Sequence, residues 1–158
     1  MRVGIGYDAH PLISGRSLVL GGIKIPFDKG LSGHSDADVL THAIIDAMLG
    51  AAGLKDIGNQ FPAEDSRYKD ISSLILLDEV NELLKAKGFE IGNIDAIIIA
   101  QQPKLSSFID LMRDHISQTL GIVLEQVMIK ATTTDGLGFT GKEEGIAAYA
   151  VALVKGKT

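Results

Sequence analysis

The sequence of 158 residues contains no cysteine and no tryptophan, and only 5% of its residues are aromatic. A chain without cysteine can form neither a disulfide nor a thiolate metal site, so any bound metal ion would need imidazole and carboxylate ligands. No run of 18 uncharged apolar residues occurs, which argues against a membrane-spanning helix. The formal net charge is −5 and no Lys/Arg-rich run is present, which argues against a nucleic-acid partner.

What the chain does contain is 46% apolar residues and 18 glycines. This apolar share is enough for one compact domain with a buried core, so residues 1–158 are expected to form a single domain. Residues 1–10 resemble the start of a strand rather than a secretory signal, which would have an apolar centre and a cleavage site. We therefore expect a soluble intracellular protein.

Hydrophobic periodicity predicts roughly four strands and three helices. The expected strands are 2–8, 16–26 with a glycine break, 93–102 and 125–135, and the expected helices are 34–53, 70–88 and 105–120. The alanine-rich segment 145–154 fits either a helix or a buried strand. These elements indicate an α/β or α+β sandwich.

Two polar residues follow the first apolar run, in the segment GYDAHP. Side chains alternate along a strand, so Asp8 and His10 would point to the same side. A carboxylate beside an imidazole can bind a metal ion, act as a general base or simply form a hydrogen bond. The pair alone does not decide among these roles.

The helix expected over 34–53 carries Asp38, His42 and Asp46 at intervals of four residues, so the three would share one face. Catalytic Zn²⁺ sites usually have three protein ligands and one open position. Asp8, His10 and His42 form a plausible set of ligands. Two alternatives remain: Asp38 could only cap the helix as part of the S-x-x-D motif that begins at Ser35, and His42 could be a solvated surface residue.

Longer stretches cover the chain in order and at characteristic spacing. They are RVGIGYDAH (2–10), GHSDADVLTHAIIDAMLGAAGLKDIG (33–58), IIAQQPK (98–104) and KATTTDGLGFTGKEEGIA (130–147). Together they closely resemble the 2-C-methyl-D-erythritol 2,4-cyclodiphosphate synthase family of the non-mevalonate isoprenoid pathway. The resemblance runs essentially from end to end.

The resemblance implies a phosphorus–oxygen lyase. Its substrate would be 4-diphosphocytidyl-2-C-methyl-D-erythritol 2-phosphate, whose 2-phosphate attacks the β-phosphate, closes an eight-membered cyclic diphosphate and expels CMP. Two rival functions are a metal-dependent phosphoesterase and a non-catalytic trimer that binds isoprenoid diphosphate. Neither the host compartment nor the rate follows from the sequence, and we expect a cytoplasmic protein, with the plastid stroma as the open alternative.

The resemblance also implies two metal ions. One Zn²⁺ per subunit would be held by Asp8, His10 and His42. A second divalent cation, Mg²⁺ or Mn²⁺, would be held at Asp135, where the family has a glutamate. Aspartate keeps the hard oxygen ligand but is one methylene shorter, so we expect the ion to bind with a shifted backbone or an intervening water.

The family's catalytic positions match His34 and Thr133. His34 and Ser35 are expected to begin the helix, where backbone N–H groups favour phosphate, and the family places them at the substrate's 2-phosphate. Helix capping is the competing role for the Ser35 hydroxyl.

Further family positions match substrate contacts. They are Asp46, Asp56, Ile57 and Gly58 near the erythritol, Phe61 and Asp65 at the edge of the site, Ala100, Gln101, Gln102, Pro103, Lys104, Leu105 and Ser106 around cytosine, and Ala131, Thr132, Thr134, Phe139 and Lys142. Structural alternatives are a turn-forming role for Asp56, a solvated Lys104 and simple β-propensity for the threonines. The family commonly has arginine at position 142, and lysine lacks its planar fork, so a phosphate contact there would be weaker.

For the fold, the resemblance implies an α+β protein with a mixed four-stranded sheet packed against helices. The family forms homotrimers whose active sites lie between subunits, with the cytidine loop on one subunit and the zinc on its neighbour. Segment 145–154 would then be a buried strand near the threefold axis. A central apolar cavity could hold an isoprenoid diphosphate, and the chain is expected to be monofunctional because it lacks a fused cytidylyltransferase domain.

Overall fold

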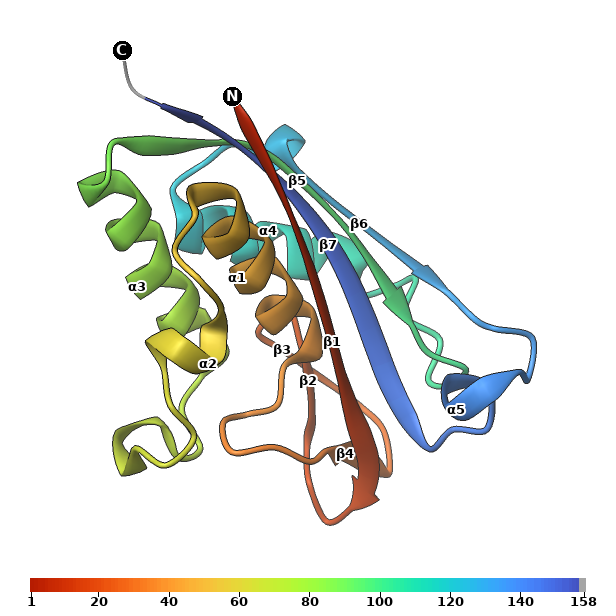
Figure 1. Ribbon diagram of the computed structural model, residues 1–158. Helices are drawn as coiled ribbons and strands as arrows, with labels where there is room; N and C mark the ends of the chain where they lie inside the picture. Colours follow the sequence, from red (N-terminus) through yellow and green to blue (C-terminus); the bar gives the residue numbers. More distant parts are fainter. Residues whose placement is uncertain (157–158) are drawn as a thin grey trace.

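The computed structural model describes residues 1–156 and contains a five-stranded sheet with helices on one face (Figure 1). In sheet order the strands are β4 (Lys29–Leu31), β1 (Arg2–Ser14), β7 (Gly145–Gly156), β5 (Phe89–Ile99) and β6 (Val127–Thr132). Strands β5 and β6 are parallel and the other neighbours are antiparallel. The mixed α+β architecture is therefore confirmed, whereas the expected number of four strands is wrong.

The additional strand is β4, which pairs with the end of β1 through the Leu12–Leu31 register. A three-residue strand with a lysine and a glycine has no hydrophobic period that sequence analysis could detect. The region expected as one extended element over 16–26 is a hairpin of β2 (Leu18–Leu20) and β3 (Ile23–Ile25). Gly21 and Gly22 form its turn, both at positive φ, so the predicted glycine break is confirmed.

Three long helices cover the sheet: α1 (Val39–Ala52), α3 (Ser73–Ala86) and α4 (Ile109–Leu120). Shorter helical turns are α2 (Ile57–Gln60), η1 (Ser66–Tyr68), η2 (Leu124–Gln126) and α5 (Gly138–Gly141). Each long helix begins several residues later than expected, because the polar residues before it form turns and caps. Within residues 1–156, no helix combines the length and apolar character that crossing a bilayer requires.

The ambiguous alanine-rich segment is strand β7, which pairs with β1 on one side and β5 on the other. Its residues Ile146, Ala148, Ala150, Ala152 and Val154 face the helices and are buried. The residues of β7 that face outward are also largely apolar. The sequence therefore lacks the alternation of apolar and polar residues that would have identified a strand. Small side chains on the inner face of β7 let helix α1 lie close to the sheet.

Two glycines of β1 set the distance between that strand and α1. A Cβ atom at Gly4 would clash with the backbone of Ala47 and Ala51, and one at Gly6 with the backbone of Ala43 and Ala47. The helix therefore packs directly on the strand backbone. This close contact brings the end of β1 and the first turn of α1 together, where the candidate site lies.

The sheet face opposite the helices carries several exposed apolar side chains. Val3, Ile5 and Tyr7 of β1 lie beside Tyr149 and Val151 of β7, and the two tyrosine rings are 4.6 Å apart between centroids. We call this set of five residues the open face. A contiguous exposed apolar surface of this kind marks an interaction site in proteins.

Candidate metal centre and substrate site

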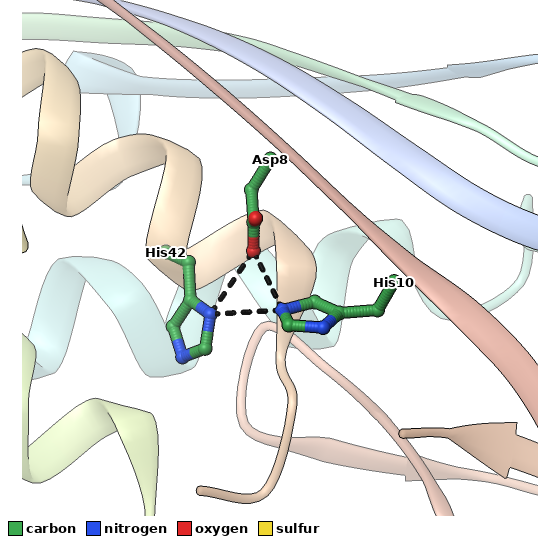
Figure 2. Close-up of side chains that lie close together, drawn as sticks. All are labelled: Asp8, His10 and His42. Carbon is green, nitrogen blue, oxygen red and sulfur yellow. Dashed lines mark hydrogen bonds and ion pairs between the residues drawn. The ribbon is translucent and has the colours of Figure 1, made fainter. Parts of the chain in front are cut away.

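Three side chains meet where β1 lies against the start of α1 (Figure 2). Asp8 and His10 point from β1 toward the helix, and His42 points back from its first turn. Asp8 Oδ2 is 2.8 Å from His10 Nε2 and 3.0 Å from His42 Nδ1. The two histidine nitrogens are 3.3 Å apart. The structure thus brings together the three residues that the sequence singled out as metal ligands.

These three atoms fit a divalent metal ion. Ligand atoms about 2.0 Å from a tetrahedral Zn²⁺ lie roughly 3.3 Å from one another, close to the observed separations. One carboxylate oxygen and two imidazole nitrogens are also a donor set that zinc accepts. The side chains of Asp8 and His42 are 25% and 12% exposed, so the centre is largely shielded from solvent.

Within the triad, Asp8 and the histidines each favour the charged form of the other. Burial would raise the pKa of Asp8, but hydrogen bonds from His10 and His42 outweigh it and lower that pKa to about 2. Burial would lower the pKa of His42, but the hydrogen bond and charge of Asp8 raise it overall. Asp8 is therefore ionised at neutral pH and ready to ligate a cation.

A pocket of about 310 Å³ opens over the triad. It is lined by the predicted residues Asp8, His10, His34, Ser35, His42, Ile57, Gly58 and Phe61, together with Ala63, Tyr68 and Leu76. Sequence analysis missed the last three because an alanine, a tyrosine and a leucine in helical or turn segments carry no chemical signature. The edge-to-face contact of Phe61 and Tyr68 forms one aromatic wall.

The loop before α1 differs from the expectation. His34 and Ser35 do not begin the helix: they lie in the loop before it, and the N-cap is Asp38. Asp38 is fully buried and accepts hydrogen bonds from Thr41 and from the backbone N–H groups of Gly21 and Gly22. The idea of a shared Asp38–His42–Asp46 face is therefore wrong for Asp38. Asp38 does cap the helix, but as its N-cap residue and not as the last residue of an S-x-x-D motif capped by Ser35.

The acidic residues around α2 and η1 have local partners. Asp46 accepts a 2.8 Å hydrogen bond from the Ile57 N–H, and burial raises its pKa. Asp56 caps α2 by accepting from the Asn59 N–H, and Asp65 pairs with Arg67. Asp56 therefore shapes a turn, as its structural alternative proposed, and Asp46 fixes that turn against α1.

A second pocket, of about 470 Å³, lies beyond the ends of β5 and β6. It is lined by the predicted residues Ala100, Gln101, Gln102, Pro103, Lys104, Leu105, Ser106, Ala131, Thr132 and Thr133. The Gln101 side chain accepts a hydrogen bond from the Gly136 N–H, which joins the two loops, and the Gln102–Pro103 peptide is cis. Backbone groups of these loops can present donors and acceptors to a planar ring.

The remaining predicted residues follow β6. Asp135 is exposed at positive φ, and its N–H and carboxylate lie 3.3 and 3.4 Å from Thr133 Oγ1. The Thr134 hydroxyl donates to the Leu137 carbonyl and so closes the loop. Phe139 lines a third pocket of about 360 Å³ beside His10, whereas Lys142 is exposed at the end of α5.

The metal triad and the second pocket lie at the same end of the sheet. His10 is opposite Ile146 and Ile99 is opposite Ala147, so the metal ligands of β1 and the end of β5 lie beside neighbouring positions of β7. Even so, the predicted residues near the metal and those of the loop after β5 line separate pockets. Strand β6 lies three positions from β1 in the sheet, roughly 14 Å away at the usual strand spacing.

Fold and site together define an α+β protein with a candidate metal centre and a second, separate pocket beyond β5 and β6. The model of the YgbB family matches residues 1–155. A protein of Pelotomaculum thermopropionicum named 2-C-methyl-D-erythritol 2,4-cyclodiphosphate synthase is 61% identical over 98% of this chain and 95% of its own length.

Two solved structures match this chain over almost its whole length. The bifunctional IspDF of Campylobacter jejuni superimposes with a TM-score of 0.95 at 41% identity, and the match covers 98% of this chain and 42% of that one. IspF of Plasmodium falciparum, solved as a CDP complex, superimposes with a TM-score of 0.87 at 36% identity over 99% of this chain and 97% of its own. The chain belongs to the YgbB family.

Proposed function

We propose that this protein converts 4-diphosphocytidyl-2-C-methyl-D-erythritol 2-phosphate to 2-C-methyl-D-erythritol 2,4-cyclodiphosphate and CMP. The observation that carries this proposal is the convergence of Asp8, His10 and His42 beside a pocket, in a chain 61% identical to a protein named for that synthase. The reaction makes the protein a lyase of isoprenoid precursor synthesis.

Asp8, His10 and His42 would hold one Zn²⁺ per subunit, and Asp135 would hold a second divalent cation, Mg²⁺ or Mn²⁺. When bound, these ions neutralise and align the phosphates that must approach each other. An acidic protein has few other means of doing so, since its formal net charge is −5. The carboxylate of Asp135 is exposed and so can reach a solvated ion.

Hydroxyl and imidazole groups around the triad would bind the 2-phosphate. His34 is exposed at the rim of the pocket, and the Ser35 hydroxyl lies inside it. Thr133 would act with His34 on the phosphate under attack, from the loop that also carries Asp135. Thr132, Thr134, Phe139 and Lys142 are proposed as further contacts of this loop with the substrate.

The erythritol hydroxyls would contact the turn that joins α1 to α2. Asp46 and Asp56 supply carboxylates there, and Ile57 and Gly58 supply backbone groups at the pocket wall. Phe61 and Asp65 would border the same region. Because Asp46 already holds the Ile57 N–H, its contact with a diol would also stiffen the turn.

Cytidine would bind the pocket beyond β5 and β6. Its volume of about 470 Å³ suits a nucleoside, and Lys104 places a positive charge at its edge. The CDP complex of the P. falciparum relative supports a cytidine diphosphate ligand for this chain. Binding would rely on backbone groups of residues 100–106 rather than on aromatic stacking.

We further propose that three copies form a homotrimer through the open face, with each active site between two subunits. The exposed apolar side chains of β1 and β7 support an interface there, and the two separate pockets support a site completed by a neighbour. A central cavity of that trimer would be available to an isoprenoid diphosphate. A cytoplasmic location is proposed with this pathway role.

Product analysis of the purified protein tests the proposal. Metal-stripped protein is expected to release no CMP from the cytidylyl substrate, and added Zn²⁺ and Mg²⁺ are expected to restore release of one CMP per substrate without inorganic phosphate. His42→Ala should remain inactive with both ions. Inorganic phosphate as the main product would favour a phosphoesterase, and binding without turnover would favour the non-catalytic trimer.

A further inference from the structure

The His42 ring has a hydrogen-bond partner on the edge that faces away from Asp8 and His10. Its Nε2 atom is 2.8 Å from the hydroxyl oxygen of Ser73, the first residue of α3. The Ser73 hydroxyl in turn donates a hydrogen bond to Asp36 Oδ1. We propose that Ser73 and Asp36 are positioning residues that keep the proton of His42 on Nε2 and so present Nδ1 to the metal ion.

The number of hydrogen-bond donors and acceptors around the ring supports placing the His42 proton on Nε2. An ionised carboxylate only accepts hydrogen bonds, so the single proton of the Ser73 hydroxyl goes to Asp36. The Ser73 oxygen then has only lone pairs to offer His42, and Nε2 must be the donor. Nδ1 donates to Asp8 when no metal ion is bound. A metal ion would take the place of that Nδ1 proton, and with the remaining N–H held on Nε2 the neutral imidazole offers the Nδ1 lone pair that a metal ligand needs.

Asp36 is itself fixed by backbone groups. Its Oδ2 accepts from the Ser73 N–H at 3.0 Å, and its Oδ1 accepts from the Asp38 N–H at 3.1 Å. Two backbone bonds join the same loops, from the Asp36 N–H to the Ile71 carbonyl and from the Asp70 N–H to the His34 carbonyl. The loop before α1 and the loop before α3 therefore hold Ser73 and Asp36 in place.

Ser35 lies near the same ring nitrogen but has a different role. Its Oγ is 3.2 Å from His42 Nε2 and accepts a hydrogen bond from the Ala37 N–H. Both of these contacts use its lone pairs, so the Ser35 proton remains available to a phosphate oxygen. Ser73, which has no exposed surface, is the residue that orients the ring.

The affinity for Zn²⁺ tests the proposal, measured by competition of the whole protein with a chromophoric chelator. Ser73→Ala is expected to weaken Zn²⁺ binding about 10- to 100-fold, the usual effect of losing such a partner. Asp36→Asn should also weaken binding without opening a cavity at Ser73. Ser72→Ala is the matched control, because Ser72 is exposed and its side chain makes no cap hydrogen bond.

Nuclear magnetic resonance of zinc-loaded protein with ¹⁵N-labelled histidine gives a second readout. Wild type should show a slowly exchanging His42 Nε2–H proton, and Ser73→Ala should lose it. Equal Zn²⁺ affinity in Ser73→Ala, Asp36→Asn and wild type would overturn the positioning role alone. Wild type that binds no Zn²⁺ would overturn both this inference and the metal centre of the proposed function, on which it depends.

Discussion

At the scale of single residues, the Asp8 carboxylate joins the two histidines of the candidate metal centre. It lies 2.8 and 3.0 Å from the two histidine nitrogens, and these contacts lower its pKa to about 2 although burial opposes the change. The folded protein therefore binds this proton more weakly than the unfolded chain, whose aspartates titrate near the ordinary value of 3.8.

Metal-free protein is accordingly expected to lose stability in acid through Asp8. Above pH 3.8, the pKa of Asp8 in the unfolded chain, the ionised carboxylate stabilises the fold by about 2 kcal/mol. This stabilisation is lost as the pH falls toward about 2, the pKa of Asp8 in the folded protein. Urea unfolding of wild type and Asp8→Asn at about pH 5 and about pH 2 measures it. Wild type should lose about 2 kcal/mol more than the variant, and equal losses would contradict the role of Asp8.

Strand and helix periodicities made Asp8, His10 and His42 a plausible set of ligands, and the resemblance to the synthase family decided for them against a solvated His42. Ser73 and Asp36 were not predictable, because their contact with His42 depends on how two loops pack together. Whether Asp38 faces the site or caps the helix could not be decided from the sequence for a similar reason. Its partners Gly21 and Gly22 belong to a hairpin that is distant in sequence, so no local motif reveals that it is fully buried.

At the scale of elements, the contact of α1 with β1 positions the site. Gly4 and Gly6 let the helix backbone rest on the strand, and the ligands His10 and His42 lie just beyond this contact. The spacing is tight because a methyl group at either glycine would meet backbone atoms, which cannot move aside as a flexible side chain can.

Gly6→Ala is therefore expected to destabilise the fold by about 1–3 kcal/mol and to weaken Zn²⁺ binding by separating the ligands. Gly50→Ala is the matched control, because Gly50 lies on α1, the helix that packs against Gly6. Its added methyl group would lie 3.9 Å from the Ile5 carbonyl, and alanine stabilises a helix relative to glycine by about 1 kcal/mol. Thermal and urea unfolding measure both changes; similar stability of the two variants would contradict the packing argument.

Most elements could be predicted from hydrophobic period, and the failures have physical causes. The β7 segment was ambiguous because both of its sheet faces are largely apolar. The β4 strand was missed because three residues contain no period, and the start of α1 was placed too early because Asp38 rather than Ser35 provides the cap.

At the scale of the whole molecule, the open face and the two separate pockets both favour assembly. Within residues 1–156 the long helices cover one face of the sheet (Figure 1). The opposite face exposes apolar side chains that water would solvate poorly. The homotrimer and the single monofunctional domain stay predictions.

Ile5→Asp should dissociate the proposed trimer, because it places a charge in the middle of the open face, where Ile5 is 68% exposed in the single chain. Ile75→Asp is the control, since Ile75 is 51% exposed on α3 and lies away from that face. Sedimentation velocity should give a trimer for wild type and Ile75→Asp and a monomer with little activity for Ile5→Asp. A wild-type monomer with full activity would contradict a site shared between subunits.

The central claim is that this protein closes a ring between two phosphates. Phosphorus NMR of zinc-loaded wild type with the cytidylyl substrate and Mg²⁺ tests it most directly. We expect two mutually coupled resonances of a cyclic diphosphate, together with CMP, and neither with His42→Ala. A linear phosphorylated product or free phosphate from the wild-type protein would show that the metal centre performs a different reaction.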